Sequence, residues 1–374
     1  MRLMMRWIAL LGVAGLLCAA PQRKKKPEKE ITQTLEVLPD PPAVIKADTS
    51  RLVFHVSPLS GKGLLSQQVR EGIRAIWRTN NKAVVVKLRA LVAGTGDMRR
   101  VQSIVSEMFS EKRLPLPVVN VVQVGVLPLE GAQVILEATS VTKKPVNPHG
   151  LAFISGQGAS GPINAEQPST PITGLTAKSL AGLRHALSGV GSTAADVTRV
   201  TCYTSSLDDY SDVHRMVATE FPHAALVIAQ AERAPLAALV ECEAVARLRK
   251  APSSGLQMVN PPGLTPSPNF SQVAVVGPRQ VAFTGTQLAF RFQDSDVRLA
   301  FDRLKSSLEQ AGVSMRDVVM SNIYPLTGSI QQKVRAIRFE FYNKERPPAS
   351  TMILFQGLPS LDASFGVDVV AVVP

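Results

Sequence analysis

Three stretches of this chain resemble one another, and this repeat constrains the fold more than any other feature of the sequence. They read "LPLPVVNVVQVGVLP" (114–128), "FPHAALVIAQAERAP" (221–235) and "RPPASTMILFQGLPS" (346–360). Each is rich in strand-forming residues and carries a proline near its end at a matching distance. Because self-similarity of this kind marks a repeated supersecondary unit, the chain is expected to contain three copies of one module.

The order of elements is the same in each copy: strand, helix, strand, helix and a closing pair of strands. In the second copy, "GLAFISGQG" is a strand that ends at glycines, and "GLTAKSLAGLRHALSGVG" has leucines at helical spacing. The third copy follows with "RQVAFTGTQLA" and "VRLAFDRLKSSLEQAGV", and the first copy is a more compressed version. The alternation of strands and helices predicts an α+β fold in which a mixed sheet is backed by two helices.

Proline- and glycine-rich segments divide the copies. "KKPVNPHG" and "APSSGLQMVNPPGLTPSPN" read as linkers. The expected organisation is a signal peptide at 1–20, a flexible leader at 21–48, and modules at 49–145, 146–250 and 251–374.

The first residues indicate export. Two arginines precede an apolar run, Trp7 to Leu17, which is followed by small residues, the layout of a secretory signal. The run is too short to cross a bilayer as a mature helix. Lipidation of Cys18 is an alternative, so the expected location is periplasmic or secreted, with a lipid anchor as the other outcome. The membrane is expected as a partner only through this segment.

Charge and composition argue against several classes of function. The formal charge is +12, but aromatic residues make up only 5% of the chain, so the interleaving of basic and aromatic residues that suits nucleic-acid binding is missing. No specific nucleic-acid partner is expected. The five histidines have no paired metal-ligand spacing, and neither a phosphate loop nor a dinucleotide fingerprint is complete. We therefore expect neither a metal nor a cofactor. Cys202 and Cys242 lie in apolar strand-like runs and are expected to be buried free thiols.

The motifs of the second and third copies resemble the RidA/YjgF family, also known as the L-PSP endoribonuclease family. The resemblance rests on "AFISGQ", on "GSTAADVTRVTCYTSSLDDYSDVHRMVATEF" and on the closing "LVECEAVA", and in the third copy on "SPNFSQVAVVGPRQVAFTGTQ". It implies three tandem Rid/chorismate-mutase-like domains. Because such proteins form trimers with ligand clefts between subunits, it also implies an intramolecular pseudo-trimer that is a monomer in solution.

The resemblance also implies a site. Members with deaminase activity hold the carboxylate of a 2-imino acid with an arginine, which donates two parallel hydrogen bonds. This arginine stands nine positions before the turn proline, and the corresponding residues here are Val119, Leu226 and Ser350. None of the three copies therefore has the arginine at that position.

Other positions of the family motif persist. The catalytic acid carries over to Glu241, six residues after Pro235, and with a longer turn to Glu137 and Asp368, each nine residues after its proline. Such an acid in an apolar strand is solvated, paired or protonated. Four further ligand-binding positions follow from the resemblance, three of them hydroxyls and one an aromatic residue in place of tyrosine: Ser57, Ser155, Thr284 and Phe270.

Three functions remain open. The first is an exported Rid-like protein that binds small molecules in clefts between its modules. The second is an enamine or imine deaminase similar to 2-iminobutanoate/2-iminopropanoate deaminases. The third is the endoribonuclease activity attached to the family name.

Overall fold

The computed structural model of the chain describes residues 37–94, 96–162 and 171–374. The predicted signal peptide at 1–20, including Cys18, and the predicted leader up to residue 36 lie outside the described residues. Within the described part, no helix is long and apolar enough to cross a membrane.

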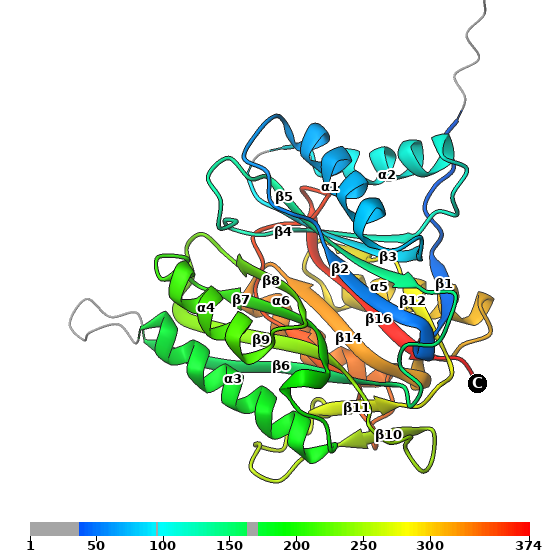
Figure 1. Cartoon of the computed structure of the whole chain (residues 1–374), viewed down its shortest axis with the longest axis vertical. Coiled ribbons are helices and arrows are strands. Elements are labelled where there is room, and N and C mark those ends of the chain that lie inside the picture. Colours follow the sequence, from blue (N-terminus) through cyan, green and yellow to red (C-terminus); the bar gives the residue numbers. More distant parts are fainter. Residues whose placement is uncertain (1–36, 95, 163–170) are drawn as a thin grey trace, which may run out of the picture. The chain divides into compact units, whose positions relative to one another are not determined.

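Each of the three modules has six elements in the predicted order (Figure 1). The first comprises β2 (Leu52–Val56), α1 (Leu65–Thr79), β3 (Val84–Val92), α2 (Arg100–Glu111), β4 (Val118–Gln123) and β5 (Val134–Val141). The second comprises β6 (Leu151–Pro162), α3 (Ile172–Gly189), β7 (Val197–Thr204), α4 (Tyr210–Glu220), β8 (Ala225–Gln230) and β9 (Ala237–Arg247). The third comprises β12 (Gln280–Thr284), α5 (Asp294–Gln310), β14 (Val318–Pro325), α6 (Gly328–Ile337), β15 (Ala349–Met352) and β16 (Ala363–Val372).

The remaining elements flank these modules. Four are strands: β1 (Val44–Asp48), β10 (Leu256–Val259), β11 (Val273–Val276) and β13 (Gln287–Phe290). Four are single turns of 3₁₀ helix: η1 (Thr49–Arg51), η2 (Ala194–Asp196), η3 (Met315–Asp317) and η4 (Arg338–Glu340).

The three sheets share one topology. Within each module the strands are ordered first, last, second and third, which gives β2-β5-β3-β4, β6-β9-β7-β8 and β12-β16-β14-β15. The second and third strands of each module are parallel, because a helix carries the chain back across the sheet, and the other pairs are antiparallel. This repeated mixed α+β topology confirms the predicted fold class.

Helices pack on one face of each sheet because their apolar residues recur at helical spacing. In α1, Val69, Ile73 and Ile76 are buried against the first sheet. In Figure 1, α3 and α4 lie side by side over the second sheet, whose apolar core they share. The opposite sheet faces contribute to two further apolar clusters, each with residues from all three modules, such as Leu91, Tyr203 and Phe355.

Three strands pair with sheets that the predicted boundaries do not give them. Residues 44–48, expected in the flexible leader, form β1, which pairs antiparallel with β12 of the third module. β10 and β11, which follow residue 250, extend the second sheet by pairing with each other and with β6. The reason is that β6 and β12 each present an edge whose backbone groups need a partner, which local sequence patterns do not record.

Candidate functional site

Strand register identifies which residues occupy equivalent positions in the three modules. Glu241 pairs with Tyr203, Ile135 pairs with Leu91, and Gly366 pairs with Tyr324. These pairs are equivalent because Thr201, Arg89 and Asn322 stand two residues earlier on strands of the same topology. Glu241 is therefore the only acid among the three equivalent positions, and the other two modules have isoleucine and glycine there.

The register separates Glu137 and Asp368 from Glu241. Glu137 pairs with Arg89 and Asp368 with Asn322, so both are equivalent to Glu243, which pairs with Thr201. The equivalence with Glu241 expected from counting along the sequence is thus offset by two residues. The reason is that the turns before β5 and β16 differ in length from the turn before β9, so distance from the proline does not fix the register.

Glu137, Glu243 and Asp368 belong to a buried polar network, which we call the central cluster. Arg89 donates to Glu137, to the Thr201 hydroxyl at 3.0 Å and to Glu243 at 3.0 Å. The other contacts in this network are Arg199 with Glu243, Thr351 with Glu243, Thr201 with Glu137, Lys87 with Asp368, and Asn322 and Tyr324 with Asp368. Several of these bonds join different modules.

The central cluster is electrically balanced. Its three cationic side chains, those of Lys87, Arg89 and Arg199, face three carboxylates. Burial acts to raise the pKa of Glu137, but Arg89 and then Arg199 outweigh it and hold that pKa below its ordinary value. Burial lowers the pKa of Lys87, and Asp368 opposes this shift. With every carboxylate paired, the cluster suits a structural role rather than a cleft open to a ligand.

Glu241 has different surroundings. Its carboxyl group lies against Gly156, where an added Cβ atom would approach Glu241 Oε1 to 2.1 Å, so a larger residue at this point of β6 would displace the Glu241 side chain. Burial, and secondarily the charge of Glu243, raise the pKa of Glu241 to about 7, while Arg335 and a hydrogen bond from the Met352 backbone oppose the rise. A carboxyl group with such a pKa can both donate and accept a proton near neutrality.

A cavity of about 290 Å³ opens above Glu241 between the second and third modules. The second module contributes Pro235 from the turn before β9 and Leu239 from β9, and the third contributes Arg335 from α6 and Met352 from β15. Most of the exposed lining is apolar, and its ionisable side chains are those of Glu232, Glu241 and Arg335.

The three positions that lack arginine are equivalent in the structure. Val119, Leu226 and Ser350 each lie on the third strand of their module, paired with Leu88, Val200 and Ser321. Leu226 is partly buried against the core of the second module, and Val119 is buried in the first.

A guanidinium group from another element of the third module lies beside Ser350. Arg338, at the start of η4, donates to the Ser350 hydroxyl at 3.4 Å and to the Asn269 carbonyl at 2.5 Å. Burial lowers its pKa to about 10, and among the described residues its Nε has no hydrogen-bond partner. Counting back from the turn prolines could not find Arg338, because this residue lies on a different element from Ser350.

The hydroxyl positions serve different contacts. Ser155 donates to the Ser271 carbonyl at 2.6 Å and accepts from the Ser350 backbone at 2.8 Å, so it links the second module to the third. A register shift between Ile154 and Gln157 of β6 marks a bulge at this point. Ser57 and Thr284 accept backbone hydrogen bonds from strands of their own modules. Phe270 lines a separate cavity beside α3.

The cysteine prediction was wrong in one respect. Cys202 and Cys242 are buried as expected, but they form a disulfide bond. They stand directly opposite each other on β7 and β9, with a Cα–Cα distance of 4.1 Å, which brings their side chains together on the helix-covered face. Among the described residues, no group of three or more metal-binding side chains could hold a metal ion.

Comparison with known proteins identifies the family. The family model described as endoribonuclease L-PSP matches residues 143–248 and 264–373, which together exceed half of the chain. The chain therefore belongs to the endoribonuclease L-PSP family, as its motifs indicated. The two matches fall on the second and third modules, and residues 1–142 are outside them.

Several solved structures are similar to parts of the chain. A protein of unknown function of the conserved Rid family from Yersinia pestis is 21% identical, covering 32% of this chain and 98% of its own, with a TM-score of 0.29. A member of the YjgF/YER057c/UK114 family from Mycobacterium tuberculosis is 22% identical, covering 32% and 99%, with a TM-score of 0.24. A putative endoribonuclease from Thermotoga maritima is 21% identical, covering 31% and 93%, with a TM-score of 0.23. No curated protein matched the chain.

Proposed function

We propose that this chain is an exported monomer whose three modules close into an internal pseudo-trimer, and that it binds small molecules in the cleft between its second and third modules. The observation that carries the proposal is Glu241. It is the one acid kept at the equivalent position, its pKa is about 7, and it lines a cavity that also contains Arg335. The equivalent positions, Ile135 and Gly366, offer no ionisable group.

The internal pseudo-trimer is supported by contacts between every pair of modules. Arg89 joins the first module to the second, Lys87 joins the first to the third, and Ser155 joins the second to the third. Export is supported by the signal-like start of the sequence and by the disulfide bond, because such bonds persist mainly in oxidising compartments.

Imine hydrolysis is the second candidate, and the pKa of Glu241 favours it. In this reaction water adds to the imine carbon, the carbon–nitrogen bond breaks, and a 2-oxo acid and ammonia are released. Glu241 accepts a proton from the attacking water and returns it to the departing nitrogen, a role that suits a carboxyl group poised near pH 7. Arg335 is placed to attract the substrate carboxylate.

Replacing Glu241 with glutamine tests both candidates. If the chain hydrolyses freshly generated 2-imino acids, Glu241→Gln is expected to slow the reaction by about 100-fold, the usual contribution of a general acid or base. If it binds without turnover, small ligands are expected to raise the melting temperature of the wild type, and the variant is expected to change that shift. The exposed Glu111→Gln, on α2 of the first module, is the matched control.

The proposal would be abandoned if the wild type neither hydrolysed imino acids above the buffer rate nor showed a ligand-dependent shift in melting temperature. Salt-sensitive cleavage of RNA that was unaffected by Glu241→Gln would instead favour the family's nuclease name.

The raised pKa of Glu241 also predicts a pH dependence of stability. The native state holds this proton up to about pH 7, whereas the unfolded state releases it near the ordinary value of 4.5, so stability is expected to fall as pH rises through that window. The loss is of the order of 2 kcal/mol, discounted from the full shift because the residue as a whole keeps some exposure to solvent. Glu241→Gln is expected to flatten the curve between pH 4.5 and 7 in urea unfolding, and an unchanged slope would contradict the shift.

A further inference from the structure

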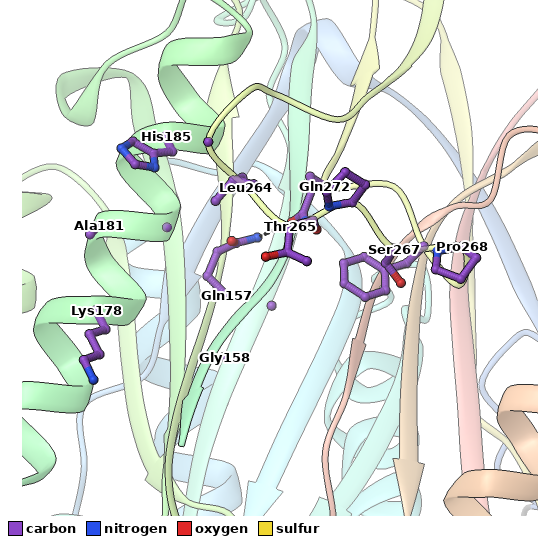
Figure 2. Close-up of a pocket in the computed structure, with 15 residues that line it drawn as sticks. Gln157, Gly158, Lys178, Ala181, His185, Leu264, Thr265, Ser267, Pro268 and Gln272 are labelled. Carbon is purple, nitrogen blue, oxygen red and sulfur yellow. Dashed lines mark hydrogen bonds between the residues drawn. The ribbon is translucent and has the colours of Figure 1, made fainter. Parts of the chain in front are cut away.

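A larger cavity lies beside α3 (Figure 2). It has a volume of about 600 Å³, within the range of small-molecule sites. One wall is α3, with Lys178, Ala181 and His185 following one another along the helix, and β6 forms the floor. The loop at 263–270, within the segment that joins the second module to the third, forms the opposite wall.

The cavity is distinct from the cleft above Glu241. Successive side chains of a strand point to opposite faces of a sheet, and Cys242, next to Glu241 on β9, packs in the core beneath α3. Gln157 likewise faces α3, because a Cβ atom added at Gly182 would lie 2.9 Å from its Oε1. The α3 wall of the cavity and the Glu241 side chain therefore lie on opposite faces of one sheet, and Gly156 and Gly158, which line the cavity at its floor, separate it from the Glu241 carboxyl.

The ionisable side chains that line the α3 cavity are both basic. Lys178 and His185 are two helical turns apart on the same side of α3, and His185 Nδ1 lies 3.6 Å from a Cβ atom built at Gly263. All 15 lining residues are described, and none of them is aspartate or glutamate. An anionic group at this rim lies near the exposed Lys178 ammonium, whereas the carboxyl of Glu241 lies behind Gly156 and Gly158 on the floor of the cavity.

Hydrogen bonds between amide groups hold the inner part of the cavity in place. Gln157 donates to Gln272 Oε1 at 2.9 Å, and Gln272 donates to the Thr265 carbonyl at 2.9 Å, so a chain of amides fixes the loop against β6. The apolar lining comes from Leu264, Phe270 and the loop prolines. Such a lining suits a flat apolar body, with the amides restricting its orientation.

We propose that the α3 cavity is a second binding site, which accepts a small molecule with an anionic head group, carboxylate or phosphate, and a flat apolar body. The head group lies near Lys178 and His185, and the body packs on Leu264 and Phe270. This site is independent of the proposed function of the Glu241 cleft.

Binding of four phenyl probes to the full chain tests this proposal. Benzoate and phenyl phosphate are expected to bind more tightly than benzamide and benzylamine in titrations followed by NMR, and salt is expected to weaken the two anions. The preferred anion distinguishes a carboxylate from a phosphate head group. Lys178→Ala is expected to weaken anion binding by about fivefold, as is typical of an exposed charge pair, and Ala181→Trp is expected to block the cavity.

Matched variants separate the two sites. Arg184→Ala removes a cation from α3 outside the cavity lining and is expected to leave anion binding unchanged. The exposed Glu111→Gln is also expected to leave it unchanged. Probe binding is measured directly and does not depend on turnover or on ligands of the Glu241 cleft, so failure of the Glu241 proposal does not decide this one. Equal affinity for the anionic and cationic probes, or undiminished anion binding in both Lys178→Ala and Ala181→Trp, would overturn the α3 site.

Discussion

Replacing Arg89 with methionine is expected to reduce the free energy of unfolding by about 3–5 kcal/mol, the usual cost of removing one partner from a buried ion pair. The side chain of Arg89 is 3% exposed and contacts both Glu137 and Glu243. Methionine fills similar volume but leaves the central cluster with one carboxylate in excess. Urea unfolding at pH 7, followed by circular dichroism, measures the loss.

A second substitution separates charge imbalance from lost packing. Arg89→Met combined with Glu137→Gln restores equal numbers of cations and carboxylates in the central cluster, and we expect it to recover about 2 kcal/mol relative to Arg89→Met alone. Arg99→Met, which removes an exposed arginine paired with Asp97, is the control and is expected to change stability by less than about 1 kcal/mol. If Arg89→Met alone were as stable as the wild type, the central cluster would not hold the modules together.

The central cluster also explains why the modules are not interchangeable. The first module supplies Lys87 and Arg89, whereas the third supplies Asp368 with Asn322 and Tyr324 as neutral neighbours. Three copies of the third module would bring together three carboxylates without a cation. Three copies of the first would bury an excess of positive charge. The divergence of the copies therefore favours one arrangement, in which each module has a fixed partner.

The order of elements could be predicted from the sequence because it depends on local signals. Apolar spacing defines helices such as α3, and glycines and prolines mark the turns between strands. Pairing between distant segments has no such signal. The pairing of β1 with β12 and of β11 with β6 depends on which sheet edges remain open once the modules fold, and the local pattern of residues 44–48 does not record it.

The equivalence of positions among the three modules could be predicted only in part, for the same reason. Counting back from the turn prolines placed Val119, Leu226 and Ser350 at equivalent positions because no insertion falls between these residues and their strands. Counting forward failed for Glu137 and Asp368, because turn lengths differ and a strand shifted by two residues keeps the same face. Arg338 was missed because it reaches Ser350 from a different element, which only tertiary structure reveals.

The disulfide bond leads to the second large effect that we expect. Replacing both Cys202 and Cys242 with alanine is predicted to lower the free energy of unfolding by about 3 kcal/mol, because the bond closes a loop of 40 residues and restricts the unfolded chain. Urea unfolding of the oxidised wild type and of the double variant, both with Cys18→Ser, measures the difference without interference from the third cysteine.

Reduction provides the matched control for this prediction. A reducing agent added to the unfolded chain before refolding is expected to lower the stability of the wild type toward that of the double variant and to leave the double variant unchanged. The same comparison is relevant to export, because the disulfide bond stabilises the protein only in a compartment where the bond can form and persist. Two free thiols titrated in the denatured, unreduced Cys18→Ser protein would contradict the bond, and would remove the structural support for an oxidising compartment.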